Sequence, residues 1–291
     1  MNNDYLIVVD ASCDYPKEEL LKNNIKVIPM EYSLNDKMLV DNGFVDDKEL
    51  YALYNSQRNN DTTKTSQITP FIYQDFFKKI LDEGKSVLYI CLSSGLSGTY
   101  NSSLNISKQL NEEYKDKNVK IMSLDSLQAT CGENLIIERA SKNLSDGKSI
   151  DDNYNDLKDS IKNIHTYFVV PDLDYLKRGG RISPLSATFG KMLKIRPVLK
   201  IDEIGKLQTI DKIRGDKKAL EHLYSLFKSH FDEKLTKSVW LVHSDAPDKI
   251  SELEKMIKAD YPSIEVHVTL ESPIIAAHTG PDFFAITSYG K

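Results

Sequence analysis

Residues 86–99 read Ser86-Val-Leu-Tyr-Ile-Cys-Leu-Ser-Ser-Gly-Leu-Ser-Gly-Thr99, a hydrophobic run followed at once by serines and glycines. The run predicts a buried β-strand, and the residues after the loop have the pattern of an amphipathic helix. A strand that enters a helix through a Ser/Gly loop makes an anion site, because backbone N–H groups converge there and the helix N-terminus carries partial positive charge. We therefore expect the loop to hold a phosphate or a carboxylate. The alternative is that Ser97 serves only as a helix N-cap.

Outside this stretch, short β-rich runs alternate with helical patterns along the chain. The predicted strands are Tyr5–Val9, Lys26–Tyr32, Ser86–Leu92, Val119–Leu124, Thr166–Val170, Ile195–Ile201, Leu207–Ile213, Ser238–His243 and Ile264–Leu270. Such alternation indicates an α/β fold with a mostly parallel sheet covered on both faces. One pair differs, because Asp202-Glu-Ile-Gly205 predicts a β-hairpin between two of the runs. The sheet in the second half is therefore expected to be mixed.

The length of the chain favours two domains. At 291 residues it exceeds the size at which a single core usually stops growing. A polar stretch within residues 145–165 separates the first four strand signals from the others. We expect an N-terminal α/β domain over residues 1–160, which carries the Ser/Gly loop, and a C-terminal α/β domain with the mixed sheet over residues 161–291.

Composition excludes several classes of function. The 38 Lys and Arg residues are spread along the chain and are outnumbered by 43 Asp and Glu, for a net charge of -5, which disfavours nucleic-acid binding. Three widely spaced cysteines form no CxxC pair, so we expect neither a disulfide framework nor a metal site, and no cofactor. A reducing cytosol suits them. No apolar run approaches the ~18 residues of a membrane span, so we expect a cytoplasmic protein without membrane insertion.

Other polar segments are candidate ligand sites. Asp10–Asp14 follows the first strand and should meet the Ser/Gly loop at the carboxyl edge of the sheet, where open α/β sheets bind ligands. Thr62–Gln67 precedes Pro70, the expected first residue of a helix, and by itself is an ordinary capping segment. Leu176–Ile182 places two glycines beside three cations, and its alternative is a solvated basic loop. Arg214 and His278 are isolated candidates, and such residues are more often a surface cation and a hydrogen-bonded histidine.

Seven motifs occur in one order along the chain. They are Asp10-Ala-Ser-Cys-Asp-Tyr-Pro16, Thr65-Ser-Gln67, Ser93-Ser-Gly-Leu-Ser-Gly-Thr99, Leu176-Lys-Arg-Gly-Gly-Arg-Ile182, Lys194-Ile-Arg-Pro-Val-Leu199, Lys212-Ile-Arg214 and His278-Thr-Gly280. This series resembles the DegV family, which includes the fatty-acid-binding subunits of bacterial fatty acid kinase. The resemblance spans nearly the whole chain, and seven motifs in order are far more specific than any single one.

The resemblance implies a two-domain α/β carrier that encloses one long-chain fatty acid and is not itself an enzyme. It implies that the hydroxyls of Thr65 and Ser97 bind the carboxylate, with Ser66, Ser93 and Ser94 beside them. It also implies a polar network near the head group, or facing a partner, that consists of Arg181, Arg214 and His278. In that family the carrier presents the carboxyl group to a separate ATP-dependent kinase, which makes an acyl phosphate.

Two motifs depart from the usual family pattern. The opening motif has Asp-Ala-Ser-Cys-Asp where Asp-Ser-Thr is usual, and the last has Pro281-Asp282-Phe283 where a glycine-rich run is usual. Replacing glycines by Asp282 and Phe283 is expected to narrow the entrance of the site or to change the surface that meets the partner.

A serine esterase or thioesterase is the competing function. Gly95-Leu-Ser-Gly-Thr99 is one residue short of the Gly-x-Ser-x-Gly nucleophile elbow and lies at the required strand-to-helix turn, with His278 downstream as a base for Ser97. Against this reading, Thr99 replaces the close-packing glycine, and no particular acid is marked as the third member of a triad. A plain interaction module is the third possibility.

Overall fold

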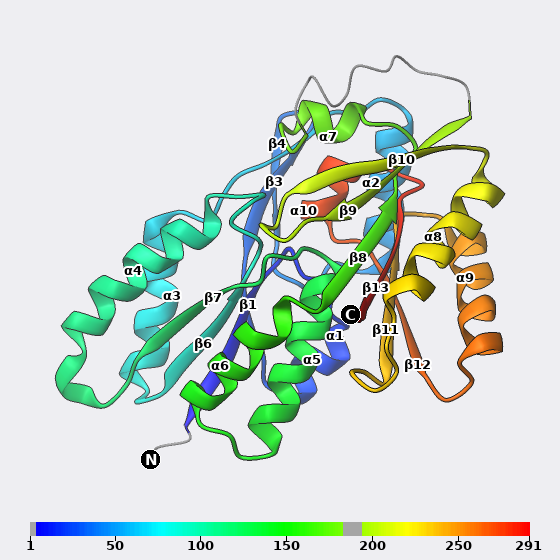
Figure 1. Cartoon of the computed structure of the whole chain (residues 1–291). Coiled ribbons are helices and arrows are strands. Elements are labelled where there is room, and N and C mark those ends of the chain that lie inside the picture. The colour runs from blue at the N-terminus through cyan, green and yellow to red at the C-terminus, as the bar shows by residue number, and fades with distance from the viewer. Residues whose placement is uncertain (1–3, 183–193) are drawn as a thin grey trace.

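The computed structural model describes residues 4–182 and 194–291, which form an α/β protein with three sheets (Figure 1). The four-stranded sheet has the order β2-β1-β6-β7, the six-stranded sheet has the order β10-β9-β8-β13-β11-β12, and a small sheet has the order β4-β3-β5. Within these described ranges, no helix has both the length and the apolar character needed to span a bilayer.

The four-stranded sheet is entirely parallel and contains β2 (Lys26–Ile28), β1 (Tyr5–Asp10), β6 (Ser86–Cys91) and β7 (Ile121–Asp125). Alternate residues of β1 and β6 face opposite sides, and both strands are buried because helices cover both faces. One face packs on α3 (Pro70–Asp82) and α4 (Thr99–Glu113), and the other packs on α5 (Cys131–Ser145) and α6 (Ile150–Ile161). The short elements α1 (Lys17–Lys22) and η1 (Lys115–Lys117) lie in connections.

The six-stranded sheet is mixed, as predicted. Its strands are β10 (Leu207–Arg214), β9 (Ile195–Ile201), β8 (Ile164–Val169), β13 (Phe284–Tyr289), β11 (Ser238–His243) and β12 (Glu265–Leu270). The only parallel neighbours are β11 and β12. Helices α8 (Asp216–His230) and α9 (Pro247–Asp260) cover its outer face (Figure 1). The predicted hairpin is β9–β10, where Gly205 has a φ of +72°.

The small sheet was not predicted. It is antiparallel and contains β4 (Lys37–Asp41), β3 (Met30–Leu34) and β5 (Thr63–Thr65), beside α2 (Asp47–Arg58) and α10 (Pro273–Thr279). The predicted strand Lys26–Tyr32 divides at Pro29, which has no N–H to donate to a ladder. Its two parts consequently join different sheets.

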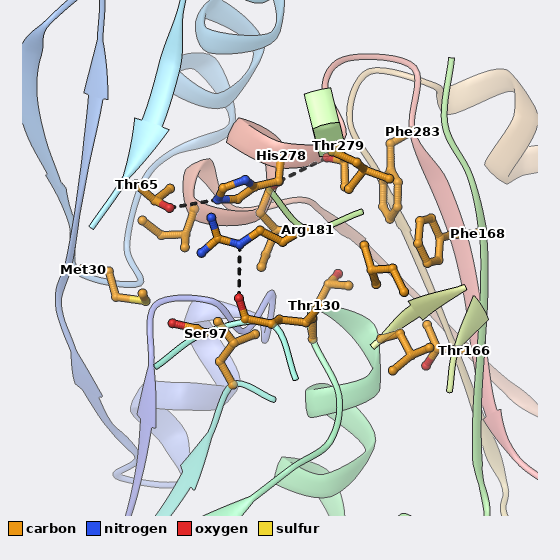
Figure 2. Close-up of a pocket in the computed structure, with 18 of the residues that line it drawn as sticks. Met30, Thr65, Ser97, Thr130, Thr166, Phe168, Arg181, His278, Thr279 and Phe283 are labelled. Atoms are coloured by element: carbon orange, nitrogen blue, oxygen red, sulfur yellow. Dashed lines mark hydrogen bonds between the residues drawn. The ribbon is translucent and has the colours of Figure 1, made fainter. Parts of the chain in front are cut away.

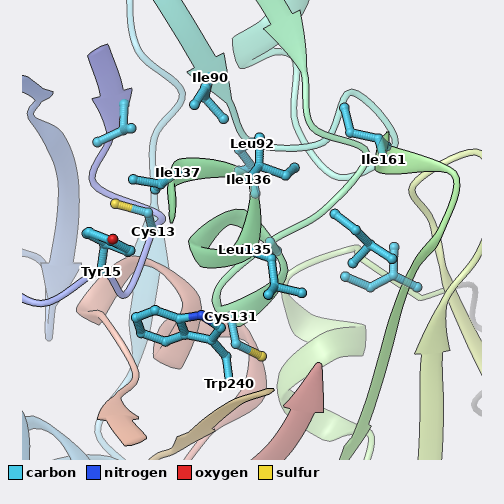
Figure 3. Close-up of a cluster of buried hydrophobic side chains, with 14 of the residues drawn as sticks. Cys13, Tyr15, Ile90, Leu92, Cys131, Leu135, Ile136, Ile137, Ile161 and Trp240 are labelled. Atoms are coloured by element: carbon cyan, nitrogen blue, oxygen red, sulfur yellow. The ribbon is translucent and has the colours of Figure 1, made fainter. Parts of the chain in front are cut away.

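Helix α5 packs between the two large sheets. Its apolar residues belong to a core cluster that includes Ile7 and Leu88 of the parallel sheet and Trp240 of the mixed sheet. Figure 3 shows Leu135, Ile136 and Ile137 of this helix with Ile90 of β6 and Trp240 of β11. The core is thus continuous across residue 160, and the division into domains at that point stays a prediction.

Candidate functional site

A cavity of about 60 Å³ lies where the three sheets meet. Its walls come from segments far apart in the sequence, and most of them are apolar (Figure 2). Among the residues that line it are Met30, Leu92, Leu96, Ala129, Phe168, Leu176, Ile201, Leu207, Ile274 and Phe283, and among the polar ones are Thr65, Ser66, Gln67, Ser97, Arg181 and His278.

Thr65 and His278 meet at one end of the cavity. Thr65 lies in β5, His278 lies in the last turn of α10, and Oγ1 of the first is 2.8 Å from Nε2 of the second. Burial and the nearby positive charge of Arg181 lower the pKa of His278 to about 3, so the ring is neutral at physiological pH. With its proton on Nε2, His278 donates to Thr65, and the Thr65 hydroxyl hydrogen is left for an anion.

Glycine makes this arrangement possible. A Cβ placed on Gly179 would lie 2.1 Å from Nδ1 of His278, so any larger residue would displace the ring. That Nδ1 is buried and has no hydrogen-bond partner among the described residues. Gly179, the first of the two glycines that follow α7 (Asp174–Arg178), therefore makes room for the histidine.

Ser97 lies opposite, at the start of the 15-residue helix α4 (Figure 2). Its Oγ accepts from the Thr99 backbone N–H at 3.2 Å and is 2.8 Å from Thr99 Oγ1. Ser97 thus bonds to the first residue of the helix and also lines the cavity. The N-cap of α4 is Gly98, and no side chain makes a capping hydrogen bond there, so the alternative that Ser97 serves as the N-cap is wrong.

Arg181 connects two of the predicted loops. Its Nε donates to the Leu96 carbonyl at 3.1 Å and its Nη1 donates to the Gly179 carbonyl at 2.6 Å. Burial lowers the pKa of this guanidinium, which still remains charged at neutral pH. No acid pairs with it within the described residues, so a positive charge lines the cavity without a counter-ion.

Three predicted residues lie outside the lining. Ser93 Oγ donates to the Gly205 carbonyl at 2.8 Å, and this bond ties the β9–β10 turn to the serine loop. Ser94 bonds through its backbone N–H to the Asp125 carboxylate at 3.0 Å. Arg214 is exposed at the end of β10, away from the cavity. Ser66 does line the cavity, beside Thr65.

The Asp10–Asp14 segment supports the site without lining it. The buried Asp10 carboxylate accepts from the Ser12 backbone N–H at 3.1 Å, from Tyr89 at 2.8 Å and from the Leu92 backbone N–H at 3.1 Å. These bonds hold the carboxyl ends of β1 and β6 together. They position the serine loop, which starts at Ser93, directly after Leu92.

Threonines that the sequence analysis did not select line the rest of the cavity. Thr166 donates to Gln128 Oε1 at 2.8 Å, Thr279 donates to Glu271 Oε2 at 2.6 Å, and Thr130 donates to the Asp14 carboxylate. Because each hydroxyl bonds to an acceptor in the wall, this part of the cavity needs no polar ligand group. Burial raises the pKa of Asp14 to about 7.

Of the two residues that replace glycines after the last motif, Phe283 lies at the cavity and Asp282 lies at the surface. Phe283 is buried and lines the cavity, and its effect on the entrance of the site stays a prediction. Asp282 has a φ of +69°, a conformation typical of glycine, and pairs with Arg58 at 2.9 Å.

Within residues 4–182 and 194–291, the geometry does not assemble a serine hydrolase triad from Ser97 and His278. Ser97 bonds to Thr99, whereas Nε2 of His278 bonds to Thr65. Nδ1 of His278, which should bond to an acid in a triad, packs against Gly179. The part of the chain that the structure describes also contains no group of three or more His, Cys, Asp or Glu able to hold a metal ion.

Comparison with known proteins gives consistent matches over the full length. The model of the DegV family of uncharacterised proteins matches residues 5–291. A DegV domain-containing protein of Clostridium perfringens is 33% identical over 288 residues, which cover 98% of this chain and 97% of that protein. Two solved structures each cover 100% of both chains with a TM-score of 0.84. One is a Thermotoga maritima protein described as revealing a fatty acid binding function, 27% identical, and the other is Bacillus subtilis DegV, described as a fatty acid binding protein, 25% identical.

Proposed function

The chain belongs to the DegV family, and from this we propose that it binds one long-chain fatty acid, with the carboxylate at Thr65 and Ser97 and the tail in the apolar part of the cavity. The observation that carries the proposal is that the hydroxyls of Thr65 and Ser97 lie at one end of the cavity, while the other end has apolar side chains and Thr166, whose hydroxyl bonds to Gln128. In Figure 2, Thr65, Ser97 and His278 lie apart from Thr166, Phe168 and Phe283.

The apolar end would supply most of the affinity. Burying ~15 methylenes at ~0.8 kcal/mol each gives a gross gain on the order of 12 kcal/mol. The hydroxyls would then mainly orient the head group. The neutral Thr65 and Ser97 hydroxyls bind a carboxylate without adding a further charge beside Arg181 in the empty protein, which suits a carrier that must release its cargo.

Positive charge near the hydroxyls supports an anionic ligand. Arg181 lines the same cavity without an acidic partner among the described residues, and the N-terminus of α4 adds partial positive charge beside Ser97. Neutral His278 completes the arrangement, because in the tautomer with its proton on Nε2 it donates to Thr65 and so leaves the Thr65 hydroxyl hydrogen for the ligand.

We further propose that the protein is a non-catalytic carrier that presents the carboxyl group to an ATP-dependent fatty acid kinase. Arg214 is exposed outside the cavity, where it could meet a partner rather than the lipid. Asp282, paired with Arg58, lies at the surface next to Phe283 of the cavity wall. Both positions suit residues that contact the kinase.

Mass spectrometry tests the proposal directly. The native spectrum of the purified protein should show about one added fatty acid per chain, and denaturing extraction should release the same acid. A Thr65→Val, Ser97→Ala double variant, purified in parallel, should carry less. Absence of acyl species, together with no binding of added fatty acid, would refute the proposal. Stoichiometric labelling of Ser97 by a serine hydrolase probe would favour the esterase instead.

A further inference from the structure

The cavity and a second hollow share a wall. A cleft of about 300 Å³ opens between the end of α6, the start of β8, the β9–β10 turn and the end of α8. Thr166 and Ile201 line both hollows. Their side chains, only 1% and 8% exposed, therefore separate the two spaces.

This wall lies where two strands separate. The register of β8 with β9 ends at the pair Tyr167 and Lys200. The next residue of β9, Ile201, pairs with Leu207 of β10. The neighbouring residue of β8 is Thr166, which has no partner in the β8–β9 ladder. The β8–β9 ladder thus stops before Thr166 and Ile201, and side chains close the gap.

Neighbouring residues confirm where the boundary runs. Ala129 lines the cavity and Gln128 lines the cleft, although they are consecutive. Thr166 is held in place, since it donates to Gln128 at 2.8 Å and accepts from Thr287 at 2.9 Å. Ile201 has only apolar atoms in its side chain, so it is the part of the wall that can be trimmed without leaving a polar group unpaired.

We propose that Ile201 closes the tail end of the cavity and thereby sets the longest acyl chain that the protein holds well. The inference rests on the proposed function. Figure 2 places Thr166 and Phe168 away from Thr65 and Ser97, so the wall lies at the end that a tail would reach. Each methylene buried before the wall improves affinity about fourfold, the equivalent of ~0.8 kcal/mol, whereas a methylene that meets the wall gains nothing.

The experiment is a titration of wild type, Ile201→Val and Ile201→Ala with saturated fatty acids from about 12 to about 22 carbons. For wild type, affinity should rise about fourfold per methylene to a limit and then fall. Ile201→Ala should move this limit to chains about two to four carbons longer, because it removes three carbons from the wall and joins the cavity to the cleft. Ile201→Val should move it less.

Ile274→Ala is the matched control, because Ile274 is 2% exposed and lines the cavity but not the cleft. It should weaken binding of all chain lengths without moving the limit. The chain length of the fatty acid extracted from each purified variant is a second measurement, and only folded protein carries such a lipid through purification. An unchanged limit in both Ile201 variants, with normal binding by wild type, overturns the inference and leaves the proposed function intact. Failure of wild type to bind any of the acids removes the proposed function itself.

Discussion

Thr65 and His278 are 213 residues apart in sequence, and a hydrogen bond of 2.8 Å joins Oγ1 of the threonine to Nε2 of the histidine. The bond links the small sheet to α10 and orients the hydroxyl that we assign to the carboxylate. In the proposed function, this contact lies at the head-group end of the cavity.

Thr65→Val and Ser97→Ala should each weaken fatty-acid binding by about 1–3 kcal/mol, since each removes a hydrogen bond to a charged group. The losses should be non-additive, because both donors address one carboxylate. Calorimetric titration measures them. Ser94→Ala, in the same loop but outside the cavity, is the control and should bind normally. Normal affinity in the double variant would place the head group elsewhere.

Gly179→Ala should lower affinity with little effect on the backbone, because the new Cβ would lie 2.1 Å from Nδ1 of His278 and push the ring from Thr65. The variant combined with His278→Ala tests this cause. If the contact is responsible, Gly179→Ala should have almost no further effect once the ring is gone. Equal losses in the two backgrounds would mean that the clash is not the reason.

His278 should make stability depend on pH in one direction. Its pKa is about 3 in the folded protein and ~6.5 when unfolded, so between these values the unfolded chain binds the extra proton. Stability is therefore fully present above pH ~6.5 and falls as the pH decreases, by at most about 1.4 kcal/mol per unit for this group. Urea unfolding of wild type and His278→Asn from pH 7.5 to 5 should show a smaller decrease in the variant. The same slope in both would contradict the shifted pKa.

Ser93→Ala should destabilise the protein by about 1–3 kcal/mol, because it leaves the Gly205 carbonyl without the donor that ties the hairpin to the serine loop. Ser94→Ala provides the comparison, since no side-chain bond of Ser94 is lost among the described contacts. Urea unfolding measures both variants. Equal stability of the two would show that the Ser93 bond contributes nothing.

Arg214→Ala should reduce kinase-coupled acyl-phosphate formation by at least tenfold, about 1.4 kcal/mol, while fatty-acid affinity changes much less. The reason is its position, exposed and outside the cavity. Lys206→Ala removes another exposed cation of the same hairpin and should leave turnover normal. Parallel losses of affinity and turnover in Arg214→Ala would mean that Arg214 holds the lipid.

Sequence periodicity predicted most of the strands in the two large sheets, but it missed β4, β5 and β13. β13 follows the last motif as an apolar run at the chain end and pairs between β8 and β11. β5 has three residues, Thr63–Thr65, whose polar side chains resemble a capping segment. Both depend on partners far away in the chain, and a short segment contains no signal for such partners.

By itself the sequence determined the α/β alternation, the mixed second sheet and the position of the serine loop between a buried strand and a helix, because local patterns of apolar residues, glycine and proline encode these features. Only the tertiary structure decided which hydroxyls face the cavity. Ser93 and Ser97 look alike in the motif, yet the first bonds to Gly205 and the second lines the cavity. The direction of a hydroxyl depends on acceptors contributed by distant segments, and those acceptors meet it only after the sheets have packed together.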